Sequence, residues 1–286
     1  MTRNWFVKAA SMTLAIGLLA GCGGAKPTTP ATTPATTPAP APATQQPTAK
    51  SFKVAMSTDV GGLNDDSFNA AAWRGLNQLK AGGGYDVKAI ESQKPENFES
   101  NFRTLMDEGH DLIWGIGFMM TDPTNTLAKQ NPNQKFAIID SVVNQPNVAS
   151  VVFKEEEGSF LMGIMAAKTT KSKKVGFVGG IESDVITHFE EGFLAGVKAV
   201  DPSVKVVSVY ASSFTDSAKG KQIALQMFSD GADVVFHAAG GVGQGVIEAA
   251  KAQNKFAIGV DSDQNKLAPQ NVISSMMKRV DVAVED

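Results

Sequence analysis

The sequence from Phe52 onward predicts an α/β protein made of two similar lobes, each built on a parallel sheet. Short apolar runs rich in β-branched residues alternate with segments of helical periodicity, which is typical of βαβ units. The two halves also repeat each other, because Lys135-Phe-Ala-Ile138 and Lys255-Phe-Ala-Ile258 are identical and each runs into an Asp-Ser pair. The repeat places Asp140 and Asp261 at the carboxyl ends of parallel strands, where open α/β sheets bind ligands.

Residues 1–21 are predicted to be a lipoprotein signal peptide. Arg3 and Lys8 precede an uncharged apolar run, residues 9–20, that is too short for a permanent transmembrane helix. The run ends in a small-residue cleavage site followed by Cys22, a pattern that resembles the bacterial lipobox. We expect Cys22 to be lipidated and to anchor the mature protein to the cell membrane on its extracytoplasmic side. The alternative is a plain secretory peptide with a chance cysteine.

Composition argues against a disulfide-stabilised protein and against a nucleic-acid-binding protein. Cys22 is the only cysteine in the 286 residues, so the exported part must be stabilised by its core rather than by disulfides. The formal net charge is −3, and removal of residues 1–21 takes away two basic residues and no acidic one. A chain with this charge carries no footprint for nucleic acid, so we expect no nucleic-acid partner.

Residues 22–50 are predicted to be a tether rather than a domain. They consist largely of Thr, Pro, Ala and Gln, and Ala-Thr-Thr-Pro occurs at 31–34 and again at 35–38. Proline-rich chain extends by ~3.1 Å per residue, so the tether can hold the folded part up to roughly 85 Å from the lipid. That reach lets the folded part meet a partner in the same membrane.

Strands and helices are expected in regular alternation through both halves. The first set of strands is predicted at 52–58, 86–91, 112–117, 135–139 and 148–153, and the second at 174–179, 204–210, 233–238, 255–260 and 272–277. Helices are predicted between the strands, including 67–81, 155–168, 184–200, 216–230 and 242–254. Residues 279–286 have the pattern of an amphipathic helix that is just beginning, with no strand after it, so we expect the sequence to be truncated.

A family resemblance rests on several ordered blocks of sequence. The segment 57–69, Ser-Thr-Asp-Val-Gly-Gly-Leu-Asn-Asp-Asp-Ser-Phe-Asn, is followed by a helix that contains Ala-Ala-Ala-Trp-Arg-Gly at 70–75. Together these segments resemble the basic membrane protein family of lipoprotein receptors, which includes purine-nucleoside receptors. Further matching blocks lie at 147–158, 189–193, 213–220, 239–243, 259–263 and 275–281.

The resemblance implies a type I periplasmic-binding-protein fold, in which two Rossmann-like lobes are joined by a hinge and the ligand lies in the cleft. The chain would cross between the lobes near 152–154, again near 276–279, and a third time beyond Asp286. Lobe 1 would then comprise 51–153 with 279–286 returning to it, and lobe 2 would comprise 154–278. The resemblance also implies a monomeric receptor that delivers a nucleoside to the permease and ATPase subunits of an ABC importer.

The ligand-binding residues expected from this resemblance also suit a nucleoside chemically. A flat base favours aromatic faces, and ribose hydroxyls favour hydrogen-bond acceptors with a few donors. Phe68 and Phe214 lie in polar, loop-like segments, and the family pattern implies that they sandwich the base; alternatively, each packs its loop onto its lobe. The remaining candidates are Asp59, Asn69 and Asp140 for the base edge, and Gly240, Asp261 and Lys278 for the ribose.

Each polar candidate has an alternative role. The three aspartates can cap helices or form turns after strands, and Lys278 can be a solvated lysine at a helix start. If Lys278 lies in the cleft, it can donate to a hydroxyl and offset the clustered carboxylates. Three carboxylates against one lysine would repel a phosphate, so we expect neutral nucleosides, with a purine preferred, rather than nucleotides.

Catalytic, metal and cofactor motifs are not evident. The glycine loop 240–245 lacks both the spacing of a dinucleotide loop and a Walker lysine, and His110, His188 and His237 have no metal-ligand spacing. His237 lies inside an apolar strand and is expected to be a hydrogen-bonded core residue. We therefore expect no enzyme, cofactor or metal; the alternatives are a sensor or adhesin on this fold, a receptor for a sugar or other small metabolite, and a nucleoside-cleaving enzyme that uses Asp140 and Asp261.

Overall fold

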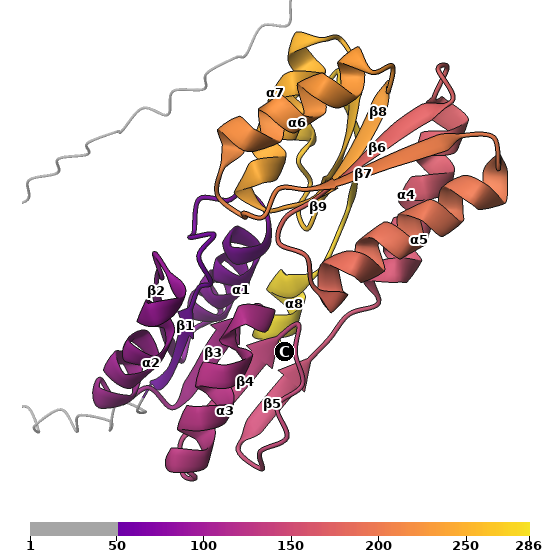
Figure 1. Cartoon of the computed structure of the whole chain (residues 1–286). Helices are drawn as coiled ribbons and strands as arrows, with labels where there is room; N and C mark the ends of the chain where they lie inside the picture. Colours follow the sequence, from indigo (N-terminus) through magenta and orange to yellow (C-terminus); the bar gives the residue numbers. More distant parts are fainter. Residues whose placement is uncertain (1–50) are drawn as a thin grey trace, which may run out of the picture. The chain divides into compact units, whose positions relative to one another are not determined.

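The computed structural model describes residues 51–286, coloured from indigo to yellow in Figure 1. The signal peptide, Cys22 and the tether predicted for 1–50 lie outside the described residues. Within the described part, the strands form two five-stranded sheets with orders β2-β1-β3-β4-β5 and β10-β9-β8-β6-β7, and the strand pairs in both are parallel. The predicted pair of parallel-sheet lobes is confirmed.

The first sheet is built from the amino-terminal half of the described chain. Its strands are β1 Phe52–Ser57, β2 Tyr85–Ile90, β3 Leu112–Ile116, β4 Lys135–Ile139 and β5 Val148–Val151. Its connecting helices are α1 Phe68–Gly82, α2 Phe98–Asp107 and α3 Thr121–Gln130, with one-turn 3-10 helices η1 Pro95–Asn97 and η2 Phe118–Met120. The central strands β3 and β4 are almost wholly apolar and buried, as expected for a parallel sheet covered on both faces.

The second sheet follows the same plan. Its strands are β6 Lys174–Gly179, β7 Lys205–Tyr210, β8 Val234–Ala238, β9 Phe256–Val260 and β10 Val272–Met276. Its helices are α4 Glu155–Thr169, α5 Asp184–Val200, α6 Ser217–Ser229 and α7 Gly241–Ala252, and the 3-10 helix η3 Asn265–Leu267 follows β9. All the predicted strands are present and begin and end close to the predicted residues; β5 ends at Val151, earlier than predicted, and the chain leaves the sheet there.

Each sheet has a hydrophobic cluster on both faces. In the first lobe, α1 covers one face with Leu76, and α2 and α3 cover the other with Phe102 and Leu127. In the second lobe, α4 and α5 cover one face and α6 and α7 the other. Burial of these side chains, at about 25 cal/mol per Å² of apolar surface, is the main stabilising contribution in a protein domain without disulfides.

The last helix returns to the first lobe after β10 has completed the second sheet. Helix α8 Val280–Glu285 buries Val280 and Val284 in the first-lobe cluster that contains Leu76 of α1, and Figure 1 shows it beside the first sheet. The two helices approach closely at Gly75, where a β-carbon would lie 2.2 Å from the carbonyl oxygen of Asp281. The chain therefore passes between the lobes after β5 and again after β10.

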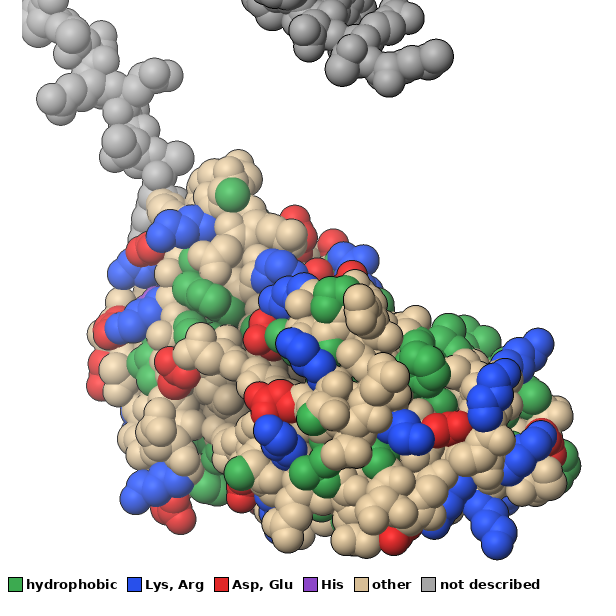
Figure 2. All heavy atoms as spheres, turned by 90° about the horizontal axis from the view of Figure 1, so that it is seen from above, with side chains coloured by type: hydrophobic (Ala, Val, Ile, Leu, Met, Phe, Trp, Pro, Cys, Tyr) green, Lys and Arg blue, Asp and Glu red, His purple; other side chains and the backbone are tan. Residues whose placement is uncertain are grey.

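On the face seen in Figure 2, Lys and Arg side chains are interspersed with Asp and Glu side chains, and neither charge dominates. Among the described helices, none combines the length and the hydropathy that a bilayer span requires.

Candidate functional site

Two Asp-Ser turns, Asp140-Ser141 after β4 and Asp261-Ser262 after β9, have the same backbone geometry. Asp140 and Asp261 adopt left-handed conformations with φ of 66° and 63°. Their backbone N–H groups donate to the neighbouring edge strand in the same way, to Val151 O at 2.8 Å and to Met276 O at 2.9 Å. Aspartate tolerates this conformation better than most residues, which explains its presence at both turns.

A cavity of about 50 Å³ lies between the two sheets and is lined from both lobes. Sites for small molecules usually measure about 300–1,000 Å³, so a ligand of that size requires the lobes to move apart. All the predicted ligand-binding residues line it, although their contact with a ligand stays a prediction. They are Asp59, Phe68, Asn69, Asp140, Phe214, Gly240, Asp261 and Lys278.

Aromatic rings form the apolar part of the cavity wall. Phe68, the first residue of α1, is half-buried, and Phe214, from the loop after β7, is 9% exposed. The ring of Phe214 lies against Gly180, where a β-carbon would be 2.1 Å from Cε1, so only glycine leaves room for it. Phe118 of η2 was not predicted; it comes from the opposite lobe and packs edge-to-face on Phe214, with ring centroids 6.3 Å apart.

A carboxylate cluster forms the polar end of the cavity in the first lobe. Asp59 Oδ1 accepts from Gly61 N and from Asn69 Nδ2, both at 2.8 Å. Asp65 caps the start of α1 by accepting from the backbone N–H groups of Ser67, Asn69 and Ala70 at 2.8 to 3.0 Å. Because the Asn69 amide nitrogen is committed to these carboxylates, its oxygen Oδ1 is buried without a partner among the described residues.

Burial changes the protonation of this cluster. It raises the pKa of Asp59 to about 6, against the hydrogen bonds from Asn69 and Gly61, which lower it. It also raises the pKa of Asp65, even though four hydrogen bonds act in the opposite direction. Keeping these carboxylates charged in the cleft therefore costs folding free energy, and a ligand that donates hydrogen bonds to them would reduce that cost.

Lys278 lies at the centre of the site, between the lobes. Its Nζ is 2.6 Å from Asp140 and 2.7 Å from Glu155 Oε1, and the residue is only 3% exposed. The rings of Phe68, Phe153 and Phe189 surround the ammonium group, with Nζ 4.9 to 5.5 Å from their centroids. The alternative of a solvated lysine is therefore wrong, and the predicted offset of clustered carboxylates by Lys278 is present.

The charges around Lys278 decide its protonation. Burial alone would lower its pKa, but the charges of Asp140, Glu155 and Asp261 raise it above the usual value, so the ammonium group persists. For Asp140, burial raises the pKa and the charge of Lys278 opposes that change. For Asp261, burial raises the pKa to about 7, while Lys278 and a 2.5 Å hydrogen bond from Ser67 Oγ lower it.

Several residues of the site were not predicted from the sequence. Asp65, Phe118 and Phe189 line the cavity, Glu155 pairs with Lys278, and Ser67 reaches Asp261 across the cleft. The sequence carried some signal for Asp65 and Ser67, which stand inside the segment 57–69 on which the resemblance rests. Phe189 stands in the matching block 189–193, although its spacing is that of a core helix residue. Phe118 carried no signal, because it follows an apolar strand.

A group of potential metal ligands, Glu155, Glu156 and His188, lies near the site, with ligand atoms within 4.8 Å of one another. Glu155 is already paired with the Lys278 ammonium, whose positive charge opposes a second cation beside it. We therefore assign Glu155 to the ion-pair cluster around Lys278 rather than to a metal site.

Comparison with known proteins agrees with this geometry. The family model described as ABC transporter substrate-binding protein PnrA-like, named Bmp, matches residues 52–286. The chain is 43% identical to the ABC transporter nucleoside-binding protein BmpA of Lactococcus lactis, over 82% of this chain and 73% of that protein. It is 40% identical to the CD4+ T-cell-stimulating antigen of Listeria monocytogenes, over the whole of this chain and 83% of that protein.

A solved structure supports the architecture. An ABC transporter solute-binding protein from Aeropyrum pernix superposes with a TM-score of 0.78 at 33% identity, covering 82% of this chain and 69% of that chain. This similarity, together with the two parallel-sheet lobes, confirms the predicted periplasmic-binding-protein fold.

Proposed function

Because the chain belongs to the Bmp family of PnrA-like ABC transporter substrate-binding proteins, we propose that it captures a nucleoside in the cavity between its lobes and delivers it to an ABC importer. The observation that carries the proposal is the pairing, in one cavity, of aromatic walls with hydrogen-bond acceptors from both lobes. A nucleoside has a flat apolar base and a polyhydroxylated sugar, and it needs both kinds of surface.

The base belongs at the first-lobe end of the cavity. Phe68 and Phe214 supply faces for stacking, which is worth about 1–3 kcal/mol per base. The unpartnered Asn69 Oδ1 and the carboxylates of Asp59 and Asp140 offer acceptors to the ring and exocyclic N–H groups of a base. A purine presents a larger face and a longer polar edge than a pyrimidine, and we propose a purine nucleoside on this ground.

The ribose belongs beside Asp261, Lys278 and Gly240. Asp261 accepts hydrogen bonds, the Lys278 ammonium donates them, and Gly240 brings backbone close to the cavity through a left-handed conformation with φ of 54°. A phosphate at this position would face Asp261 and Asp140, and Lys278 is the one cation among the described residues that line the cavity. Nucleosides are therefore favoured over nucleotides.

The rest of the proposal concerns the chain before the folded part. Lipidation of Cys22 would hold the receptor, as a monomer, on the extracytoplasmic side of the cell membrane. The tether of residues 22–50 would let the receptor reach the permease and ATPase subunits of its importer. Replacement Cys22→Ser should release the protein from the membrane fraction or leave it uncleaved, and unchanged processing and detergent partitioning would rule out the anchor.

Calorimetry with nucleosides, their free bases, pentoses and nucleotides tests the ligand. The wild-type protein should bind a purine nucleoside more tightly than its free base, the nucleotide or the pentose. Phe68→Ala should weaken nucleoside and free base by a similar 1–3 kcal/mol, so the ratio between them should stay nearly constant. Asp261→Ala should bring the affinities for nucleoside and free base closer together, because it removes a charge-assisted hydrogen bond of about 1.5–3 kcal/mol to the sugar.

Two outcomes would contradict the proposal. Tighter binding of a pentose than of any nucleoside would identify a sugar receptor, and release of free base during the titration would identify a nucleoside-cleaving enzyme. Lys221→Ala, on the exposed surface of α6 away from the cavity, is the control that should change neither affinity.

A further inference from the structure

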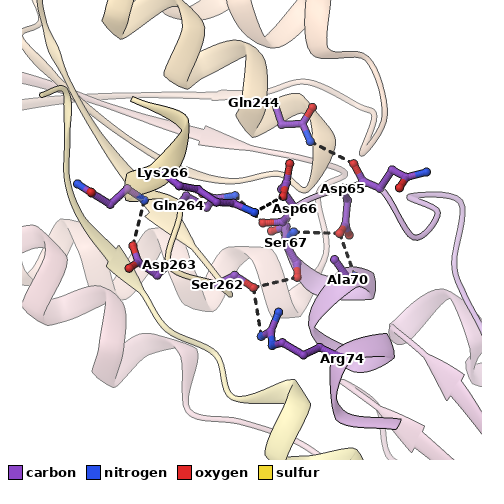
Figure 3. A network of polar contacts seen from close by, with 12 residues as sticks. Asp65, Asp66, Ser67, Ala70, Arg74, Gln244, Ser262, Asp263, Gln264 and Lys266 are labelled. Carbon is purple, nitrogen blue, oxygen red and sulfur yellow. Dashed lines mark hydrogen bonds and ion pairs between the residues drawn. The ribbon is translucent and has the colours of Figure 1, made fainter. Parts of the chain in front are cut away.

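A second set of contacts joins the lobes outside the cavity wall, in the network drawn in Figure 3. On the first-lobe side it uses the loop before α1, residues 64–67, and Arg74 of α1. On the second-lobe side it uses the segment after β9, residues 262–266, and Gln244 of α7. The contact made by Gln264 differs from the others because the Gln264 side chain is fully buried.

Most of the other contacts are exposed or long. Lys266 Nζ pairs with Asp66 Oδ1 at 2.7 Å, but the two side chains are 67% and 38% exposed, and such pairs stabilise little. Ser262 Oγ lies 3.4 Å from Ser67 O and 3.5 Å from Arg74 Nη2, near the limit of a hydrogen bond. By contrast, Gln264 is 0% exposed, and its Nε2 donates to the backbone carbonyl of Asp66 at 3.2 Å.

The orientation of the Gln264 amide is fixed from inside the second lobe. The backbone N–H of Val260 donates to Gln264 Oε1 at 3.0 Å, and because a backbone N–H can only donate, this side of the amide must be the oxygen. The NH₂ group must then face the other way, toward Asp66 of the first lobe. Gly259 leaves room for the oxygen, since a β-carbon there would lie 2.6 Å from Oε1.

His237 of β8 provides the second donor to the same oxygen. Its Nε2 lies 3.0 Å from Gln264 Oε1, so the hydrogen of the neutral ring belongs on Nε2. The residue is 0% exposed and Nδ1 has no partner among the described residues. The ring packs against Gly243 of α7, where a β-carbon would be 2.0 Å from Cε1, so only glycine leaves room for it.

We propose that Gln264 is a latch residue that holds the two lobes together without ligand, and that His237 and Val260 position its amide for the bond to Asp66. The partner lies just before α1, where Asp66 adopts a left-handed φ of 50°, a conformation that aspartate tolerates. Gln264 also stands on the segment that begins with Asp261. Closing the latch therefore brings Asp261 to Ser67 and completes the cavity wall, a role that rests on the proposed function.

The latch can be tested without any ligand. Spin labels at Lys129→Cys in α3 and Ser229→Cys in α6, in the full chain carrying Cys22→Ser, report the distance between the lobes. The wild-type protein should show a closed population, and Gln264→Glu should reduce the ratio of closed to open forms by about tenfold. Glutamate keeps the acceptor for Val260 and His237 but turns a second acceptor toward the Asp66 carbonyl.

Two further variants make the test specific. Gln264→Leu has a similar size without the hydrogen bonds, should fold if the glutamate variant does not, and should also open the lobes. Lys266→Ala removes only the exposed pair with Asp66 and should change the ratio less than about twofold. A wild-type protein that is wholly open, folded Gln264 variants with an unchanged ratio, or an equal effect of Lys266→Ala would each overturn the latch.

Stopped-flow release of adenosine and inosine gives the second readout. The Gln264 variants should release a bound nucleoside faster by the same factor. They should bind it at least as fast as wild type, because a latch that closes the empty lobes can only slow the entry of the ligand. If neither nucleoside binds wild type, the proposed ligand is wrong while the spin-label distances still decide the latch. Release that stays at the wild-type rate in a variant whose lobes have opened would separate the latch from ligand retention and overturn its role in the cavity.

Discussion

The two Asp-Ser turns have the same sequence and the same backbone, but their side chains make different partners. In the first lobe, Asp140 pairs with the Lys278 ammonium, and the hydroxyls of Ser141 and Thr121, both in that lobe, are hydrogen-bonded at 2.7 Å. In the second lobe, Asp261 accepts from Ser67 of the opposite lobe. Ser262 also turns toward that lobe.

This difference shows that the sequence repeat specifies the backbone of the turn but not the partners of its side chains. Both turns follow an identical Lys-Phe-Ala-Ile segment, and the parallel ladder gives both aspartates the same backbone hydrogen bond. The partner of each side chain depends on what the other lobe places opposite it. The first turn is therefore stabilised by charge at the hinge, whereas the second turn is one side of the contact that closes the cleft.

The charge at the first turn should give the largest effect on stability. Lys278→Met removes the ammonium group between Asp140, Glu155 and Asp261 and leaves buried carboxylates without a cation, a change that costs roughly 3–5 kcal/mol. Urea denaturation at pH 8 measures the loss. The loss should shrink at pH 5, because the carboxyl groups can then take up protons instead of remaining charged.

Lys266→Met is the matched control, because Lys266 also pairs with an aspartate but is exposed. Its cost should be about 0–1 kcal/mol. Similar losses for the two lysines would mean that Lys278 does not compensate buried charge, and that the first turn is held by its backbone alone.

At the second turn, removing the charge should increase stability rather than decrease it, and the increase should depend on pH. The pKa of Asp261 is raised from 3.8 in the unfolded chain to about 7 in the folded protein, so the folded protein binds this proton more tightly. The carboxyl group therefore costs no stability below pH 4 and costs progressively more as the pH rises to about 7. Asp261→Asn should raise the free energy of unfolding by on the order of 2–4 kcal/mol at pH 8 and leave it nearly unchanged at pH 4.

Asp140→Asn provides the comparison between the turns. It also removes a buried carboxylate, but it leaves the Lys278 ammonium with one counter-charge fewer, so its gain at pH 8 should be smaller than that of Asp261→Asn. Equal gains at both positions would show that burial, and not the partner across the cleft, sets the energy of these carboxylates.

The sequence predicted the fold well because the fold depends on local patterns. Parallel strands buried on both faces are short and apolar, the helices between them have their own periodicity, and each pattern can be recognised within about ten residues. The repeated Asp-Ser pairs then located the edge of the sheets at which the cavity lies. Asp59 and Gly240 also follow strands and line the cavity, but they were expected from the family resemblance rather than from a local pattern.

The partners of these residues were less predictable, because they come from distant parts of the chain. Glu155 was expected only as the start of a helix, yet the passage after β5 brings it to Lys278, which the passage after β10 brings from the other direction. Gln264 lies in a polar segment that resembles an ordinary loop. Its contact with the first lobe is a hydrogen bond to Asp66, about 200 residues earlier in the chain, which no local pattern records.

The serines of the two turns should give the smallest effects and the cleanest comparison. Ser141→Ala removes a 2.7 Å hydrogen bond within the first lobe and leaves the Thr121 hydroxyl with Phe118 O as its partner, so it should cost about 1 kcal/mol of stability. Ser262→Ala removes only contacts of 3.4 and 3.5 Å, so its effect on stability should be a few tenths of a kcal/mol.

The readout that distinguishes the serines is the distance between the lobes rather than the stability. Ser141→Ala should lower the unfolding midpoint without changing the closed population, because its partner, Thr121, lies in the first lobe. Ser262→Ala should do the reverse and open the lobes slightly, by less than the Gln264 variants, because its contacts cross the cleft but are long. If Ser141→Ala opened the lobes, the two turns would be coupled through the hinge at Lys278, and identical sequence would then imply a shared role rather than a shared backbone.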